Sequence, residues 1–297
     1  MLACHRENGE LFRLFWPNVD YGQHLGRFWP GIRVTMPGRQ TRTKWFHLNF
    51  WKSSQRYLDN TNILETALSR AEHHLNVIQS DFVIPDHDIL VRNFKFCNEG
   101  EKKSIAFFVY CNFNIEESAA QDSAYVDYTN ESLVFFRRNT YLALGGSGYP
   151  LSGYQCGRRG TDTDPYHDAA KGLLRGNRDH ILQNTGSLSW DLGELKPREH
   201  KTITLYLAAG NNEEQVRALL SEARSREGGC WLEETRQYWH GWLKPVLHQK
   251  TEHRAGAFNR SLLAIKLMLN KETGAPIAAP EFDPHHTSCG GYGYCWP

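Results

Sequence analysis

The chain has 297 residues, enough for one large or two ordinary domains with a sizeable core, and tryptophan and tyrosine are plentiful. Its 34 basic and 33 acidic residues nearly cancel, and no run of five like charges occurs. The electrostatic footprint of a nucleic-acid or anionic-membrane binder is therefore missing, and a neutral ligand is expected.

The N-terminal segment lacks the basic start, apolar core and cleavage site of a signal peptide. No apolar run approaches the roughly 20 residues needed to cross a bilayer. The cysteines are odd in number and scattered, which argues against a disulfide framework; they are Cys4, Cys97, Cys111, Cys156, Cys230, Cys289 and Cys295. We expect a cytoplasmic, reduced protein. The opening also reads as a strand already under way, which leaves an internal start at Met1 open.

Up to about Ala208 the chain shows short apolar or alternating segments separated by turn residues, the pattern of an antiparallel sandwich or barrel. The clearest strand signals are residues 11–16, 31–36, 105–113, 132–138 and 202–207. In the last of these, Ile203, Leu205 and Leu207 alternate with other residues and share one face.

Three segments of this part are less regular. Residues 63–70 mix helix-forming residues with strand-like neighbours, and we predict a strand. Residues 164–174 predict a short helix, because Asp164 can cap it and Pro165 suits its first turn. The glycine-rich residues 145–148 match neither a nucleophile elbow nor a phosphate-binding loop, and predict a flexible turn.

The pattern becomes helical after Gly210. One helix is expected from the acidic residues after Asn212 until Gly228 and Gly229 stop it, and a second over residues 231–243, before Pro245. A third, over residues 254–270, carries a wide apolar stripe formed by Phe258, Leu262, Leu263, Ile265, Leu267 and Leu269. Such a stripe needs partners on more than one side, which suggests that a helical domain continues beyond this chain.

A metal site is a weak prediction at His285, His286, Cys289 and Cys295. Zinc ligands usually pair across two to four residues, whereas the longer gap between the two cysteines holds residues typical of a pocket lining. We therefore expect neither a metal nor a cofactor.

Carboxylates are numerous, and a glycosidase needs two of them, one as acid and one as base or nucleophile. Glu281 and Asp283 lie close to the aromatic C-terminal segment, but ordering of their own loop explains them better. Helix capping and surface exposure account for a second polar cluster, formed by Asp162, Asp164, His167 and Asp168.

Tyr292 and Trp296 lie four residues apart, separated by small residues and a tyrosine, and could form a flat surface on which a sugar stacks. On spacing alone, a role in the core is the more common one for such a pair.

Several motifs together resemble glucoamylases and glucodextranases of glycoside hydrolase family 15. They are Asn8-Gly9-Glu10-Leu11, Phe15-Trp16-Pro17, Arg260-Ser261-Leu262-Leu263, Thr273-Gly274-Ala275, Ile277-Ala278-Ala279-Pro280 and the run from Tyr292 to Trp296. The resemblance spans the chain from end to end, and its most specific motifs lie in the last forty or so residues.

The resemblance implies a mainly β fold: an antiparallel supersandwich over residues 1–209, a helical connector over 210–252, and the start of a truncated (α/α)₆ catalytic barrel over 253–297. In the family, the residue matching Tyr292 stacks on the terminal glucose, and that matching Trp296 frames the same subsite. The two catalytic glutamates lie further along, as does an Arg-Asp pair, so this chain alone is predicted to hold no catalytic residue and to be inactive.

The implied function is that of a fragment of an inverting, exo-acting α-glucosidase, which releases glucose from the non-reducing ends of α-glucans or malto- and isomalto-oligosaccharides. Related enzymes remain as alternatives: a glucodextranase, a trehalase-type hydrolase or a disaccharide phosphorylase. A carbohydrate-binding sandwich without catalysis is a further alternative, although the wide stripe of the third helix speaks against it.

Overall fold

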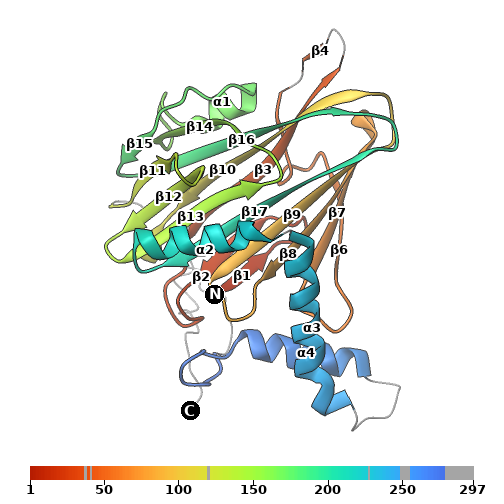
Figure 1. Ribbon diagram of the computed structural model, residues 1–297, viewed down its shortest axis with the longest axis vertical. Coiled ribbons are helices and arrows are strands. Elements are labelled where there is room, and N and C mark those ends of the chain that lie inside the picture. The colour runs from red at the N-terminus through yellow and green to blue at the C-terminus, as the bar shows by residue number, and fades with distance from the viewer. Residues whose placement is uncertain (37–38, 41, 119–120, 227, 248–254, 278–297) are drawn as a thin grey trace.

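The computed structural model describes residues 1–36, 39–40, 42–118, 121–226, 228–247 and 255–277. These residues form an antiparallel β-sandwich with helices on one sheet and at one end (Figure 1). The predicted fold class is thereby confirmed for the sandwich.

The larger sheet has nine described strands in the order β15-β11-β12-β13-β17-β9-β8-β7-β6. Their bounds are β6 Lys52–Tyr57, β7 Leu64–Arg70, β8 Leu75–Val83, β9 Ile89–Asn98, β11 Ser123–Asp127, β12 Ser132–Arg137, β13 Thr140–Ser147, β15 Asp179–Ile181 and β17 His200–Gly210. The strand predicted over residues 63–70 is confirmed as β7.

The smaller sheet follows the order β14-β16-β10-β3-β4, with β5 also paired to β3, and β1 and β2 form a separate hairpin. The bounds are β1 Leu2–His5, β2 Leu11–Phe15, β3 Leu25–Met36, β4 Arg39–Gln40, β5 Lys44–Trp45, β10 Lys103–Phe113, β14 Leu151–Arg158 and β16 Asn184–Leu195. Two 3₁₀ turns, η1 Ala71–His73 and η2 Ile115–Glu117, link strands.

The main core fills the space between the two sheets. Ile203, Leu205 and Leu207 point into it together, as their alternation predicts, and pack with aromatic side chains such as Phe94 and Phe107, whose ring centroids are 5.0 Å apart. The five described cysteines are all free thiols.

The outer face of the large sheet is covered by helix α2, Glu213–Ser225 (Figure 1). Val216 and Leu220 of α2 are buried in one cluster with Tyr206 and Ala208, the residues of β17 that face away from the main core. The Asn212 side chain accepts a hydrogen bond from the Gln215 amide at 2.8 Å and so caps the helix, close to the predicted start.

The predicted stop of this helix at Gly228 and Gly229 is wrong, because helix α3, Gly228–Leu247, begins there and includes Pro245. The chain turns earlier, at Arg226, whose backbone is extended (φ −123°, ψ 147°). Gly228 instead allows the start of α3 to lie close to β17. A Cβ atom at that residue would lie 2.8 Å from the Thr204 hydroxyl oxygen.

The flexible turn predicted at residues 145–148 is also wrong over most of its length, because Gly145, Gly146 and Ser147 belong to β13 and pair with β17. A Cβ atom at Gly145 would lie 1.9 Å from an Arg224 nitrogen, and one at Gly146 would lie 2.8 Å from the Trp190 ring. Gly146 thus leaves room for the Trp190 ring on the core face of the strand, and Gly145 leaves room for the Arg224 guanidinium on the outer face.

The short helix is confirmed as α1, Pro165–Lys171, with the Asp164 side chain accepting from the Tyr166 amide. The third C-terminal helix is α4, Ala255–Leu267, shorter than predicted. Its apolar stripe is divided, because Leu263 is 1% exposed against α3 whereas Ile265 is 51% exposed. In the part of the chain that the structure describes, no helix has the length and apolar character needed to cross a membrane.

Candidate functional site

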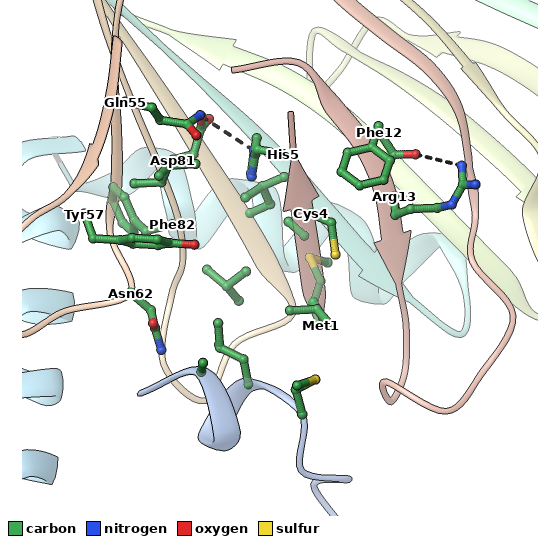
Figure 2. Close-up of a pocket in the computed structure, with 18 of the residues that line it drawn as sticks. Met1, Cys4, His5, Phe12, Arg13, Gln55, Tyr57, Asn62, Asp81 and Phe82 are labelled. Carbon is green, nitrogen blue, oxygen red and sulfur yellow. Dashed lines mark hydrogen bonds and ion pairs between the residues drawn. The ribbon is translucent and has the colours of Figure 1, made fainter. Parts of the chain in front are cut away.

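A cavity of about 510 Å³ lies at the end of the sandwich, between the β1–β2 hairpin, strands β6 to β8 and helices α3 and α4 (Figure 2). Its lining is mainly apolar. Polar and aromatic side chains from the large sheet and the helices complete it, among them Gln55, Tyr57, Asn62, Asp81 and Arg260.

Strand register builds the wall on the large sheet. Tyr57 pairs with Leu64, Leu64 with Asp81, and Asp81 with Arg92, so the four side chains form one row across β6, β7, β8 and β9. Gln55 lies two residues before Tyr57 and shares its face. This face of the sheet thus presents the polar residues Gln55 and Tyr57 on β6 and the charged residues Asp81 and Arg92 on β8 and β9.

The charged pair is fully buried. Arg92 Nε donates to Asp81 Oδ1 at 2.7 Å, and Arg92 Nη2 donates to the Gly9 carbonyl at 2.8 Å; both side chains are 0% exposed. Gln79 donates to the same carbonyl and to Asp81. Buried charges of this kind need such additional hydrogen bonds, and these attach the turn between β1 and β2 to the large sheet.

His5 of β1 lies beside this pair, with Nε2 3.5 Å from Asp81 Oδ2 and its side chain 7% exposed. Burial lowers the pKa of His5 to about 4, because its effect and that of the Arg92 charge outweigh the attraction of Asp81. The imidazole is therefore neutral near pH 7. Figure 2 shows the His5 and Asp81 side chains close to each other.

The first half of α4 is attached to the turn between β6 and β7. Arg260 Nη1 donates to the Thr61 carbonyl at 2.8 Å, and its guanidinium lies 3.9 Å from the centroid of the Tyr57 ring. Asn259 Nδ2 donates to Asn60 Oδ1 at 2.9 Å. These contacts hold one rim of the cavity.

The segment after α4 is attached to the loop that follows β2. Asn270 Nδ2 donates to Asp20 Oδ1 at 2.9 Å, and Asn18 Nδ2 donates to Glu272 Oε1 at 3.3 Å. Ile277 is 4% exposed in a small apolar cluster with residues of β1 and β2. Helix α4 is thus fixed at both ends, and the cavity lies between the two attachments.

Within the described residues, the lining of this cavity does not contain the two independent carboxyl groups that glycoside hydrolysis uses. Among its described lining residues Asp81 is the one carboxylate, and Arg92 neutralises it. Hydrolysis of a glycoside by two carboxyl groups needs a second, independent one. Nor do the described residues contain a cluster of three or more potential histidine, cysteine or carboxylate metal ligands.

The predicted sugar subsite, Tyr292 and Trp296, falls outside the described residues. The same holds for Glu281, Asp283 and the weak metal candidates His285, His286, Cys289 and Cys295. These predictions therefore stay predictions.

The polar cluster around α1 has a structural role, in part as predicted. Asp164 caps the helix, while Asp162 and His167 are exposed. Asp168 differs from the expectation of surface exposure, because it is 7% exposed and held by Arg175 Nε at 2.8 Å and Gln155 Nε2 at 3.0 Å.

The cavity was not predicted from the sequence, although a signal for it exists. Arg92 follows the apolar run Ile89 to Val91 and Asp81 precedes Phe82 and Val83, and charged residues in such strands are buried only when they are paired. Their pairing across β8 and β9 required the register, which the sequence pattern does not define.

Comparison with known families matches residues 48–244 to the family model described as glucodextranase, domain N. This match covers more than half of the chain. The chain belongs to the glucodextranase domain N family. The cavity lies partly within the matched region, since β6 to β8 and most of α3 belong to it.

This domain N chain is 24% identical over 311 aligned residues to an uncharacterised glycosyl hydrolase of Methanocaldococcus jannaschii, with 100% of the chain and 47% of that protein aligned. Its fold is similar to that of a bacterial glucoamylase solved with acarbose, with a TM-score of 0.73 at 17% identity. That match covers 92% of the chain and 40% of the glucoamylase. The chain thus spans about half the length of the relatives it matches, and it has the fold of a glucoamylase-like N-terminal region.

Proposed function

We propose that this chain is the N-terminal part of an inverting, exo-acting α-glucosidase of the glucoamylase type. The observation that carries the proposal is the domain N match, supported by the likeness of 92% of the chain to part of a glucoamylase. The archaeal relative, named a glycosyl hydrolase, is consistent with this reaction class. The substrate is an α-glucan or a malto- or isomalto-oligosaccharide, and neither nucleic acid nor membrane is a partner.

In this proposal residues 1–209 are the sandwich domain, 210–252 the helical connector and 253–297 the start of an (α/α)₆ barrel. Both catalytic carboxylates come from a later part of the enzyme, held about 6.5–9.5 Å apart so that water fits between them. Tyr292 and Trp296 contribute to the sugar subsite. The enzyme works in the cytoplasm.

The family name favours one alternative specificity, that of a glucodextranase, which differs in the linkage that is cleaved. The decisive experiment uses the longer protein that contains this chain, with maltotetraose and isomaltotetraose as substrates. Proton NMR during the first minutes identifies the anomer released. We expect β-glucose from one of the two substrates. Release of α-glucose would exclude inversion, and no release of glucose from either would refute the proposal.

A further inference from the structure

We propose that the cavity between the β1–β2 hairpin, β6 to β8 and α4 is a saccharide-binding site. Its volume of about 510 Å³ and its position between the sandwich and a helical segment are typical of small-molecule sites. The choice of a saccharide rests on the proposed function, whereas the existence and position of the site rest on the geometry alone.

The lining offers both kinds of contact that a sugar ring makes, apolar contact and hydrogen bonds. Apolar side chains, among them Phe12, Leu64, Val83 and Leu267, offer contact to the C–H faces of a pyranose. Gln55 and Tyr57 stand on the β6 side of the same space and offer hydrogen bonds to hydroxyl groups at the ring edge. A purely apolar ligand would offer no hydrogen bond to the Tyr57 hydroxyl or the Gln55 side-chain oxygen.

Hydrogen-bonding capacity remains available at this wall. Within the described residues, the Tyr57 hydroxyl makes no hydrogen bond, and Gln55 uses only its amide nitrogen, which donates to the Arg6 carbonyl and to Thr66. His5 Nε2 is buried without a well-formed hydrogen bond among the described residues. Figure 2 shows the Tyr57 hydroxyl directed into the cavity toward β1.

The charges of the site favour a neutral ligand. Arg92 neutralises Asp81, and Arg260 is engaged by the Thr61 carbonyl, the Asn62 side chain and the Tyr57 ring. Arg13 also belongs to the lining, but Figure 2 shows its side chain directed away from Tyr57. An anionic ligand would thus have to compete with existing contacts of Arg260.

The experiment is isothermal titration of the 297-residue chain with up to about 10 mM maltotriose and, separately, isomaltotriose. Ala264 lines the cavity from α4, so Ala264→Phe fills the space without removing a polar group. Ala257 is exposed on the same helix, and Ala257→Phe is the matched control. Tyr57→Phe removes only the hydroxyl. Thermal melts establish that each variant folds.

We expect binding of one trisaccharide to the unmodified chain, and a loss of at least about tenfold in affinity for Ala264→Phe, because packed side chains leave no room for the ligand. Ala257→Phe should bind normally, and Tyr57→Phe about threefold to tenfold more weakly. No binding by the folded chain, or equal binding by the two phenylalanine variants, would overturn the proposal. So would binding that Tyr292→Ala abolishes while Ala264→Phe leaves it intact. Each result is independent of whether the longer protein releases glucose, so failure of the proposed function remains distinguishable.

Discussion

Two buried residues of the sandwich have ionisation equilibria that link its stability to pH. His5 has its pKa lowered to about 4 in the folded protein, against 6.5 when exposed. Below about pH 6.5 the unfolded chain binds a proton at this residue that the folded protein does not bind, so folding stability falls until about pH 4 and then levels off.

Replacing His5 by asparagine should therefore remove part of the acid sensitivity. Between pH 7 and pH 4 the free energy of unfolding of His5→Asn should fall by about 2–3 kcal/mol less than that of the unmodified chain. Urea titrations at the two pH values measure this difference. His200→Asn, at an exposed position of β17, is the control for the loss of a histidine outside the core. Parallel behaviour of the two variants would contradict the expectation.

Asp122 has the opposite effect from His5 on folding stability, because it lowers the stability at high pH. It is 0% exposed, its Oδ2 accepts from the Ile115 amide at 3.0 Å, and its Oδ1 has no partner among the described residues. Burial raises the pKa of Asp122 to about 7. Because the folded protein then holds a proton that the unfolded chain has lost, stability decreases as the pH rises from about 4 through 7.

Asp122→Asn should consequently stabilise the protein at pH 8 by about 2 kcal/mol and have little effect at pH 4. Denaturation at both pH values is the measurement. Asp127→Asn provides the contrast, because Asp127 is buried but pairs with Arg217 at 2.7 Å, so its neutralisation should destabilise the protein at pH 8. A loss of stability in both variants would show that burial of Asp122 does not favour its neutral form.

At the scale of single elements, the cap of α2 is the clearest test of local sequence. Asn212→Ala removes the acceptor of the Gln215 amide and should lower the free energy of unfolding by about 1 kcal/mol. Asn211→Ala, at the neighbouring exposed position, should have a much smaller effect. Urea unfolding followed by circular dichroism compares the two; similar losses would mean that the cap contributes nothing specific.

Local patterns predicted the four helices and several of the strands. Alternation identified β17, and the cap and proline identified α1, because these signals are contained in a few neighbouring residues. The glycines of β13 and the start of α3 were misread for a physical reason, since Arg224, Trp190 and Thr204 determine the space at these positions from elsewhere in the chain. The cavity required the register of four strands and the attachment of α4, which no local pattern contains.

For the whole molecule, the proposed function predicts that this chain alone does not hydrolyse glycosides. Both carboxylates are supplied by a later segment in that proposal, and general acid and base catalysis accounts for many orders of magnitude in rate. A purified sample incubated with maltotetraose should release no detectable glucose. Glucose release above that of a mock purification from cells without the gene would contradict this.

The proposed subsite is tested in the longer enzyme. Stacking that strengthens as the sugar ring flattens makes Tyr292 a contributor to turnover as well as to binding. Tyr292→Ala should lower kcat/KM for maltose by about two orders of magnitude, and Tyr292→Phe should retain much more activity. Near-normal kinetics of the alanine variant, with a normal melting temperature, would remove Tyr292 from the subsite.

The attachment of α4 to the β6–β7 turn has a consequence for biosynthesis. Asn60 and Asn259 are separated by 199 positions in the chain, so the turn leaves the ribosome long before its partner exists. At synthesis rates of about 5–20 residues per second, roughly 10–40 s pass between the two events. For most of that interval β17, His200–Gly210, is also missing, so the main core between the sheets is still open. Only in the last 49 positions, from Gly210 to Asn259, is the wall beside Tyr57 a part of the completed sandwich that still lacks its cover.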